Sequence, residues 1–333
     1  MLAAHITETG APSVIRFGEV PTPQAGPGQV LVAVKAVAVN PIDTYIRAGA
    51  IAMPLTMPYV IGCDLAGVVE AVGPGATRFR VGDRVWGSNQ GLFGRQGSFA
   101  RFAAVDEHWL YPIPSEQSFN SAAAGALTGI TAWLGLHQFA RLRSEETLFV
   151  NGGTGGVGSA VVQLAKHLGA HVVTTVGTPE KGVLAKRMGA DVVLDHKSAN
   201  LDDELRRAVA ERGGIDVWFE TLRDPNLERS ISMMAMRGRI VLMAGRQARP
   251  DFPLGAFYTR DLSLVGFAMF NASPDEQRVA AEGLNAAFEA GAWRPNIARV
   301  FPLSEAAAAH QLQQDNTLEK KGTLAGKIVL TVD

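Results

Sequence analysis

Cysteine is almost absent from this chain of 333 residues, which has a single one at position 63. One thiol cannot form an internal disulfide framework or a cysteine-rich zinc site, so both are excluded. A surplus of positive charge is also missing, because 31 Lys and Arg residues stand against 32 Asp and Glu residues. Binding to a nucleic-acid phosphate backbone is therefore not expected as the main task.

Long apolar runs are missing as well. The longest weakly polar stretch, residues 122–136, contains threonines and is shorter than the ~20 residues that span a bilayer. The first ten residues, MLAAHITETG, have neither the basic flank nor the apolar core of a signal peptide. At ~150 residues per domain, the length predicts about two domains. We therefore expect a cytoplasmic protein of two domains without a membrane partner.

Glycine, in contrast, is abundant, with 36 residues. In the first third of the chain, Gly- and Pro-containing turns separate short runs that favour strands, at 29–39, 65–72 and 99–105. Many short strands at close spacing predict a compact β-rich domain.

From about residue 125 the pattern changes to strands that alternate with helices, which predicts a parallel sheet built from right-handed crossovers. The strands are expected at 147–150, 171–176, 191–194, 215–220, 239–244 and 262–269, and the helices at 157–168, 179–188, 201–211 and 226–236. In the tail we expect helices at 275–290 and 304–314 and a last strand at 327–332 that returns to the first domain. The sequence thus predicts an α/β fold, with a doubly wound sheet (123–269) inserted into a discontinuous β-rich domain (1–122 and 270–333).

The segment NGGTGGVG at 151–158 fits G-x-G-x-x-G through Gly153, Gly155 and Gly158. It follows an expected strand and opens an expected helix, which is the setting that points backbone N–H groups at a pyrophosphate. The first glycine permits a tight turn, the second a close approach of the phosphates, and the third close packing of helix on strand. The alternative is a purely structural turn.

The residues after the second strand of this sheet favour NADPH over NADH. An NAD site places a carboxylate there for the ribose 2′-hydroxyl, but Val176, Gly177 and Thr178 are neutral. Lys181 follows, and His196 and Lys197 come just after the third strand. Cations in place of the carboxylate suit a 2′-phosphate, although Lys181 and His196 are alternatively plain surface residues.

With the glycine loop placed, the whole chain resembles the medium-chain dehydrogenase/reductase superfamily, and within it the zinc-free NADPH:quinone reductases, or zeta-crystallin group. The resemblance is carried by NPIDTYIRAG (40–49), MPYVIGCDLAGVVEAVG (57–73), GDRVW (82–86), GGTGGVGSAVVQLAKHLGA (152–170), GIDVWFETL (214–222), RGRIVLMAG (237–245) and GKIVL (326–330). It implies a GroES-like β-rich domain made by both chain ends, with a Rossmann domain between them.

The same resemblance implies that no metal is bound. The positions of the catalytic zinc ligands in related alcohol dehydrogenases are occupied by Asn40 and by Gly62-Cys63-Asp64, and residues 87–98 have no cysteine. One cysteine cannot build a tetrahedral site. An alkoxide intermediate needs a Lewis acid beside it, whereas electron-poor acceptors such as quinones or activated alkenes suit a site without zinc.

Carried over position by position, the resemblance implies a set of cofactor contacts. The pyrophosphate loop comprises Thr154, Gly155, Gly156 and Val157. The adenosine end has Gly177, Lys181 and His196. Further contacts are expected at Asn226, Met243, Ala244, Gly245 and Arg246, and at the nicotinamide end at Tyr45, Phe267, Ala268 and Met269. Arg246 is either a second phosphate partner or a solvated loop residue.

For the chemistry, Asn40, Asp43 and Tyr45 are expected on a loop that faces the nicotinamide. Tyr45 or Asn40 would donate a hydrogen bond to the oxygen on which negative charge develops. Alternatively, Asn40 only shapes the turn before Pro41, and Tyr45 only packs against the cofactor. The segment 97–102 (GSFARF) departs from the GYAEY of many relatives, which leaves the acceptor open.

Three functions follow. The first is an NADPH-dependent quinone reductase, whose partner is a small electron acceptor. The second is an NADPH-dependent enone, enal or enoyl-thioester reductase, and the third a non-catalytic nucleotide-binding scaffold. The apolar strand expected at 262–269 would leave an open sheet edge, so we also expect a homodimer joined at that edge.

Overall fold

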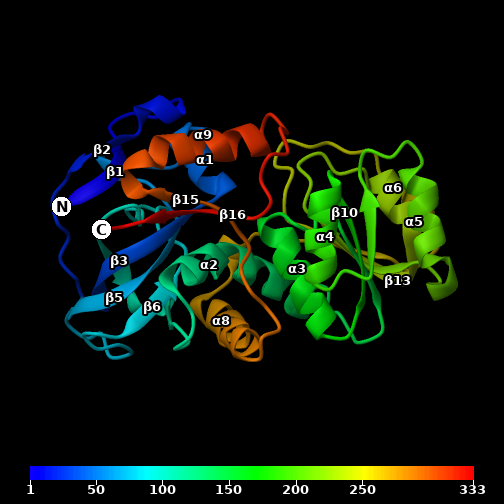
Figure 1. Cartoon of the computed structure of the whole chain (residues 1–333), viewed down its shortest axis with the longest axis horizontal. Helices are drawn as coiled ribbons and strands as arrows, with labels where there is room; N and C mark the ends of the chain where they lie inside the picture. Colours follow the sequence, from blue (N-terminus) through cyan, green and yellow to red (C-terminus); the bar gives the residue numbers. More distant parts are fainter. The chain divides into compact units, whose positions relative to one another are not determined.

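The computed structural model describes all 333 residues and divides them into two compact units (Figure 1). Unit 1 comprises Met1–Thr128, Ser273–Glu289 and Pro295–Asp333, and unit 2 comprises Gly129–Ala272 and Ala290–Arg294. Both chain ends therefore belong to unit 1. None of the helices has the length and apolar character needed to cross a membrane.

Unit 1 is rich in β-structure. Its seven-stranded sheet has the order β15-β16-β3-β5-β6-β8, with β7 also paired to β3, and a smaller sheet has the order β2-β1-β4. The strands are β1 (Leu2–Ile6), β2 (Arg16–Glu19), β3 (Gln29–Val39), β4 (Tyr59–Val60), β5 (Asp64–Val72), β6 (Arg84–Gly87), β7 (Phe102–Asp106), β8 (Leu110–Pro112), β15 (Ile297–Pro302) and β16 (Lys327–Thr331). The helices are α1 (Pro41–Arg47), α8 (Pro274–Glu289), α9 (Ala306–Thr317) and the first two thirds of α2 (Phe119–Trp133).

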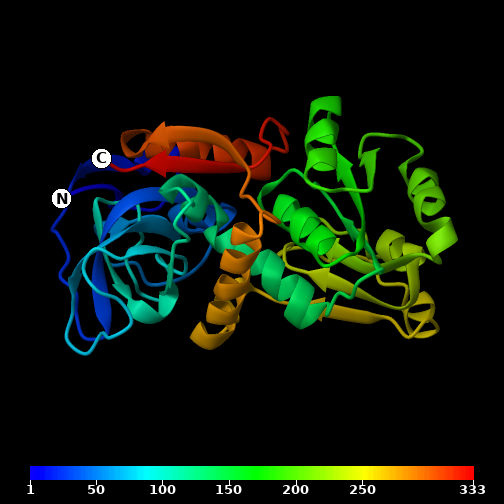
Figure 2. The ribbon, with the colours of Figure 1, turned by 60° about the horizontal axis from the view of Figure 1, so that its bottom comes forward.

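The last strand returns to the first part of the chain, as predicted. β16 pairs antiparallel with β3, with Ile328 opposite Val39, and parallel with β15. Figure 2 shows β15 and β16 side by side. Strand β3 has the bounds that the sequence predicted, and its first half alternates partly exposed positions with the buried Val30, Val32 and Val34. This alternation follows from the two-residue period of a strand with one face on the core.

Unit 2 is a doubly wound parallel sheet in the order β11-β10-β9-β12-β13-β14. Its strands are β9 (Thr147–Val150), β10 (His171–Val176), β11 (Val192–Asp195), β12 (Ile215–Glu220), β13 (Met234–Leu242) and β14 (Ser263–Gly266). The helices are α3 (Gly156–His167), α4 (Pro179–Arg187), α5 (Leu201–Val209), α6 (Leu227–Met233) and α7 (Leu254–Tyr258). The strand order reverses between the parallel neighbours β9 and β12, because β10 and β11 lie on one side of β9 and β12 to β14 on the other. The predicted α/β class is confirmed.

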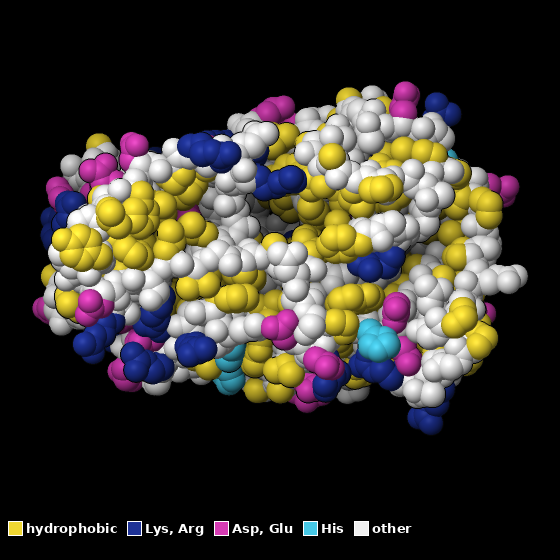
Figure 3. Space-filling view, turned by 180° about the vertical axis from the view of Figure 1, so that it is seen from behind, with side chains coloured by type: hydrophobic (Ala, Val, Ile, Leu, Met, Phe, Trp, Pro, Cys, Tyr) yellow, Lys and Arg dark blue, Asp and Glu magenta, His cyan; other side chains and the backbone are white.

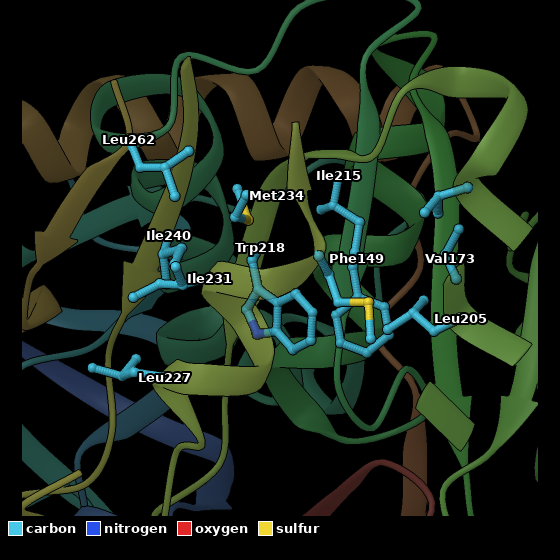
Figure 4. Close-up of a cluster of buried hydrophobic side chains, with 12 residues drawn as sticks. Phe149, Val173, Leu205, Ile215, Trp218, Leu227, Ile231, Met234, Ile240 and Leu262 are labelled. Carbon is cyan, nitrogen blue, oxygen red and sulfur yellow. The ribbon is translucent and has the colours of Figure 1, made fainter. Parts of the chain in front are cut away.

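One face of this sheet is covered by α5 and α6. Phe149, Trp218 and Ile240 from three strands meet Leu205 of α5 and Ile231 of α6 in a buried hydrophobic cluster (Figure 4). The rings of Phe149 and Trp218 lie 4.2 Å apart. The intervening strand residues point to the opposite face, where α3 and α4 pack against β9, β10 and β11.

Several sequence-based element boundaries are wrong. The helix expected over 226–236 ends at Met233, and β13 begins at Met234. The guanidinium of Arg260 donates hydrogen bonds to the carbonyl oxygens of Ile231, Ser232 and Met234 at 3.1–3.3 Å. It thereby caps the helix from a distant part of the chain. The strand expected over 239–244 likewise ends at Leu242, and the strand expected over 262–269 spans only Ser263–Gly266.

The strand expected over 99–105 begins only at Phe102. Phe99 is fully buried, and its ring lies edge-on to His310 of α9 at 5.8 Å. A Cβ on Gly62 would lie 1.9 Å from this same ring. The segment before β7 thus packs in the interior and does not form a strand, and Ala100 makes only an isolated β-bridge to Ala3.

Helix α2, which was not predicted from the sequence, continues as a π-helical segment, Leu134–Phe139. A Cβ on Gly135 in this segment would lie 2.4 Å from the ring of Phe219, so only glycine allows this approach to β12. The segment also brings Phe139 to stack on Phe267, with ring centroids 4.5 Å apart.

His310 makes the stability of unit 1 sensitive to acid. It is fully buried, neither ring nitrogen has a hydrogen-bond partner, and burial together with the charge of Arg47 lowers its pKa to about 3. The unfolded chain takes up a proton near pH 6.5, but the folded chain does not. The contribution of the neutral His310 to the free energy of unfolding is therefore complete above pH 6.5 and is lost as pH falls toward 3.

We expect the wild type to lose about 2 kcal/mol more unfolding free energy than a His310→Leu variant between pH 7 and pH 5. Urea unfolding of both proteins at pH 7, 6 and 5 measures this difference. Parallel pH profiles would contradict the assignment.

Candidate cofactor site and active site

The loops predicted to bind the cofactor in unit 2 share one edge of the sheet. The carboxyl ends of parallel strands lie at the same edge, and the loops after β9, β10, β11, β12, β13 and β14 all begin there. These loops carry, in chain order, residues 151–158, Gly177 to Lys181, His196, Asn226, residues 243–246 and residues 267–269. The topology thus brings every predicted cofactor residue of unit 2 to a single edge.

The glycine loop lies too close to its neighbours to carry side chains at two positions. A Cβ on Gly153 would lie 2.3 Å from Oγ1 of Thr174 in β10. A Cβ on Gly158 would lie 2.3 Å from the carbonyl oxygen of Gly152. At Gly155 the only atom within 4 Å is the Gly152 oxygen, at 3.3 Å, so the space beyond this residue is open. A phosphate has room to approach there.

Helix α3 begins directly behind this open space. Gly155 is its N-cap residue, and no side chain caps the helix. The first N–H groups of the helix, at Gly156, Val157 and Gly158, carry the positive end of the helix dipole. Thr154, which precedes them, is buried. The loop therefore fits a pyrophosphate.

Small and basic residues lie together after β10 and β11. A Cβ on Gly177 would lie 2.6 Å from Cε1 of His196, so the missing side chain makes room for the imidazole ring. Lys181 lies in the first turn of α4, where its N–H donates to Oγ1 of the N-cap Thr178 at 3.4 Å. Burial and the nearby charge of Lys197 both lower the pKa of Lys181. Two ammonium groups in the same small region fit a ligand with extra negative charge.

The remaining predicted contacts differ in exposure. Asn226 is the N-cap of α6, where its side chain accepts a hydrogen bond from the N–H of Arg229 at 2.9 Å. Arg246 is exposed and Met243 to Gly245 are half-buried, whereas Phe267 is half-buried against Phe139 and Met269 is buried. Their contact with a cofactor stays a prediction.

In unit 1, Asn40, Asp43 and Tyr45 lie on a helix and not on the expected loop. Pro41 provides the fixed backbone angle that suits the first helical position, and Asn40 is the N-cap residue. Its N–H donates to Oδ2 of Asp43 at 2.8 Å, as in a capping box. Because this local hydrogen bond favours a helix start, the segment predicted as a loop forms α1.

Asn40 and Asp43 are both buried, at 0% and 3% exposure. The Asn40 side chain donates to Oδ2 of Asp64 at 2.7 Å, and its Oδ1 accepts from the ammonium of Lys327. Lys327 also donates to the carbonyl of Val39 at 2.7 Å. Tyr45 is half-buried, so of the three predicted active-site residues it is the one with surface exposed to solvent.

The residues that hold Asn40 were not predicted from the sequence. Asp64 starts β5 and also accepts from Oγ of Ser88 at 2.7 Å, and Lys327 starts β16. Burial, reinforced by Asp64, raises the pKa of Asp43 to about 8, and burial raises the pKa of Asp64 and lowers that of Lys327. A lysine embedded in the apolar segment GKIVL was the available signal.

The donor set at Asn40 and Cys63 does not fit zinc. Burial and the neighbouring carboxylates raise the pKa of the Cys63 thiol, whereas zinc binds the thiolate. The Asn40 amide is held by Asp64 and Lys327. Nowhere in the chain do three or more His, Cys, Asp or Glu side chains form a group that could hold a metal ion.

Comparison with known proteins agrees with this organisation. The family model described as an alcohol dehydrogenase GroES-like domain matches residues 26–115, and the one described as a zinc-binding dehydrogenase matches residues 156–285. The quinone oxidoreductase of Homo sapiens is 32% identical over 331 residues, which cover 99% of this chain and 97% of that protein.

Three solved structures are similar over their full length. An NAD-dependent alcohol dehydrogenase gives a TM-score of 0.90 at 30% identity and covers 100% of both chains. A mycobacterial protein complexed with NADPH gives 0.85 at 31% identity, covering 99% of this chain and 100% of the other. A 2-haloacrylate reductase gives 0.83 at 29% identity, covering 99% of both.

The β-rich unit, the doubly wound sheet and the glycine loop together define an oxidoreductase that uses a nicotinamide dinucleotide. The chain belongs to the medium-chain dehydrogenase/reductase superfamily, with quinone oxidoreductases among its relatives. The GroES-like and Rossmann fold expected from the sequence is thereby confirmed.

Two glycine substitutions should separate folding from cofactor binding. Gly158→Ala forces a Cβ against a carbonyl oxygen, so we expect it to cost about 1–3 kcal/mol of unfolding free energy. Gly155→Ala meets only the 3.3 Å contact and has an ordinary φ of −71°, so the protein should fold normally while the dissociation constant for NADPH rises about tenfold or more.

Thermal unfolding and a fluorescence titration with NADPH measure both effects. Gly182→Ala in α4, whose nearest neighbours lie at 3.8 Å, is the control: it should leave NADPH binding unchanged and raise the melting temperature slightly, since alanine favours a helix over glycine. Normal NADPH binding by Gly155→Ala would contradict the placement of the pyrophosphate.

Proposed function

We propose that this protein is an NADPH-dependent quinone oxidoreductase that transfers a hydride or electrons from NADPH to a quinone without a metal. The observation that carries the proposal is the neutral end of β10, where Gly177 makes room for His196 and Lys181 lies beside Lys197. Full-length similarity to a human quinone oxidoreductase and to a mycobacterial structure with NADPH supports it.

The residues of unit 2 would bind and orient the cofactor. The N–H groups of α3 and the glycine loop would hold the pyrophosphate, and Lys181, His196 and Arg246 would hold the 2′-phosphate. Phe267, Ala268 and Met269 would line the nicotinamide end. When bound, NADPH supplies the hydride from its nicotinamide ring, and this chain contributes position and exclusion of water.

The residues of unit 1 would act on the acceptor. A quinone becomes a hydroquinone anion whose charge spreads over an aromatic ring, so a single hydrogen-bond donor suffices. The hydroxyl of Tyr45 is suited to this role, because its side chain is half-buried on α1. Asn40 and Asp43 would act indirectly, by holding the start of the helix that carries Tyr45, since both are buried within the network of Lys327 and Asp64.

The second candidate is reduction of an activated alkene, such as an enone, an enal or an enoyl thioester. The full-length similarity to a 2-haloacrylate reductase favours it. That reaction must also protonate a carbon atom. The third reading, a nucleotide-binding scaffold, requires NADPH binding without turnover.

The proposal is tested by the absorbance of NADPH in the presence of a 1,2-quinone, a 1,4-quinone, an α,β-unsaturated ketone or an enoyl-CoA, with NADH as the control. We expect oxidation with the quinones and with NADPH only. Turnover with the alkenes alone would replace the proposal by the second candidate. Binding without turnover of any acceptor would support the scaffold.

Lys181→Gln should change cofactor preference. Loss of a charge-assisted contact to the 2′-phosphate should raise KM for NADPH about 10- to 100-fold and leave KM for NADH nearly unchanged. Lys186→Gln, an exposed lysine in the last turn of the same helix, is the matched control and should behave like the wild type. Equal effects on both cofactors would show that Lys181 does not read the 2′-phosphate.

Tyr45→Phe tests the donor at the acceptor. With quinones, where solvent also supplies the proton, we expect kcat to fall about tenfold or less. With an alkene, the loss should be larger, at about 10²-fold or more. Steady-state kinetics of the variant measure the ratio, and the exposed Tyr258→Phe serves as control. An unchanged kcat with every acceptor would remove Tyr45 from the chemistry.

The edge of the sheet in unit 2 is proposed to join two copies of the chain. Strand β14 pairs only with β13, and Leu264 within it is 37% exposed. Met236, Leu254 and Tyr258 of the same unit are 61–65% exposed. Figure 3 shows hydrophobic side chains gathered over this unit on the face seen from behind. Light scattering at micromolar concentration should give a dimer, and Leu264→Arg should give a monomer. A monomeric wild type would contradict the proposal.

A further inference from the structure

A buried carboxylate ends the central strand β12, directly beneath the loops that are proposed to bind the cofactor. Glu220 is 2% exposed and is the last residue of β12. Burial raises its pKa, and the hydrogen bonds that it accepts oppose this rise. A buried carboxyl group is retained at a cost unless its hydrogen bonds are satisfied, so its partners indicate what it does.

The partners of Glu220 come from β12 itself, from the residue two positions beyond it and from the end of the neighbouring strand β9. Its Oε2 accepts a hydrogen bond from the indole N–H of Trp218 at 3.0 Å. Its Oε1 accepts from the N–H of Leu222 at 2.8 Å and from Nδ2 of Asn151 at 3.1 Å, and Nδ2 of Asn151 also donates to Oε2 at 3.3 Å. Trp218 is itself fixed in the hydrophobic cluster of unit 2 (Figure 4). The carboxylate thus accepts from Trp218 of the hydrophobic cluster and also from Asn151 of the glycine loop, so it links the two.

Asn151 is the first residue after β9 and the first residue of the glycine loop. Its carbonyl oxygen accepts a second hydrogen bond, from Oγ1 of Thr221 at 3.0 Å. The next two residues of the loop are bound to β10, because the N–H groups of Gly152 and Gly153 donate to Thr175 at 3.2 and 3.1 Å. The start of the loop is therefore held from both neighbouring strands.

We propose that Glu220 is a positioning residue for the cofactor, which acts by holding Asn151, and so the glycine loop, in the conformation that binds the dinucleotide. Its loss should weaken cofactor binding and leave the acceptor step unchanged. The inference rests on the proposed function only in that the glycine loop binds NADPH.

The geometry explains why a carboxylate is needed and an amide is not sufficient. In Glu220→Gln, one of the two acceptor oxygens becomes an NH₂ group. If the NH₂ group takes the place of Oε2, it faces the indole N–H of Trp218. If it takes the place of Oε1, it faces the N–H groups of Leu222 and Asn151. Either orientation sets donor against donor.

Trp218→Phe removes the opposing N–H and so offers a rescue. In the double variant Trp218→Phe/Glu220→Gln, the amide oxygen can take the place of Oε1 and accept from Leu222 and Asn151, while its NH₂ group no longer faces the indole N–H and meets only the longer, 3.3 Å contact of Nδ2 of Asn151. The single Trp218→Phe change leaves the link between Glu220 and Asn151 intact. The two substitutions should therefore be strongly non-additive in cofactor affinity.

Glu146→Gln is the matched control. Glu146 is also a buried carboxylate of unit 2, but it precedes β9 at the opposite end of the strand and binds Arg239 and Arg143. Its loss should lower the melting temperature without reaching the glycine loop.

The experiment measures the dissociation constant of NADPH by fluorescence titration, KM for the acceptor, and the melting temperature for each variant. We expect Glu220→Gln to raise the NADPH dissociation constant about tenfold, with KM for the acceptor unchanged, and the double variant to recover at least half of that rise on a logarithmic scale. Glu146→Gln should lower the melting temperature and leave NADPH binding unchanged.

The proposal is overturned if Glu220→Gln binds NADPH like the wild type, if the two substitutions are additive, or if Glu146→Gln weakens binding equally. Should Glu220→Gln not fold, Asn151→Ala breaks the same link from the loop side and must give the same rise. A wild type that binds NADPH but reduces no acceptor would refute the proposed function, and the titration would still test Glu220.

Discussion

The close approach of the glycine loop to its own strands is the constraint on which the nucleotide-binding unit depends. Gly153 lies against Thr174 of β10, and Gly158 lies against the carbonyl of Gly152, so the chain can turn from β9 into α3 within a few residues. That short turn leaves the first N–H groups of α3 uncapped at the carboxyl edge of the sheet. The fold therefore leaves backbone N–H groups that fit an anion as a consequence of packing, and we propose that the residues after β10 and β11 select the dinucleotide.

Both units position their functional segment by a buried polar network. In unit 1, Lys327 of the last strand holds Asn40, which starts the helix that carries Tyr45. In unit 2, Glu220 holds Asn151, which starts the glycine loop. In each case a titratable group is buried near the end of a strand and fixes the residue at which the next segment begins. Such networks are costly if broken, because each leaves a buried charge or donor without its partner.

Local patterns in the sequence predicted much of the fold, and long-range contacts explain the rest. The strands β3, β9, β10 and β12 have the predicted bounds, because period-two burial and flanking glycines are local signals. The end of α6 depends on Arg260, which is 27 residues beyond Met233 in the chain, and the helix α1 was overlooked although Asn40, Pro41 and Asp43 carry its capping signal. The glycine loop and Lys181 are predicted cofactor contacts on the strength of their position after the strands, and that role stays a prediction. Glu220, Asp64 and Lys327 were not predicted, since their roles arise from hydrogen bonds between distant segments.

The central claim is that the carboxyl edge of the sheet in unit 2 binds a dinucleotide with a 2′-phosphate. A calorimetric titration of the purified wild-type protein with NADPH and with NADH tests it most directly. We expect one NADPH site per chain and an affinity about tenfold or more above that for NADH, because the 2′-phosphate adds a charge-assisted contact. Equal affinity for the two cofactors, or no binding of either, would contradict it.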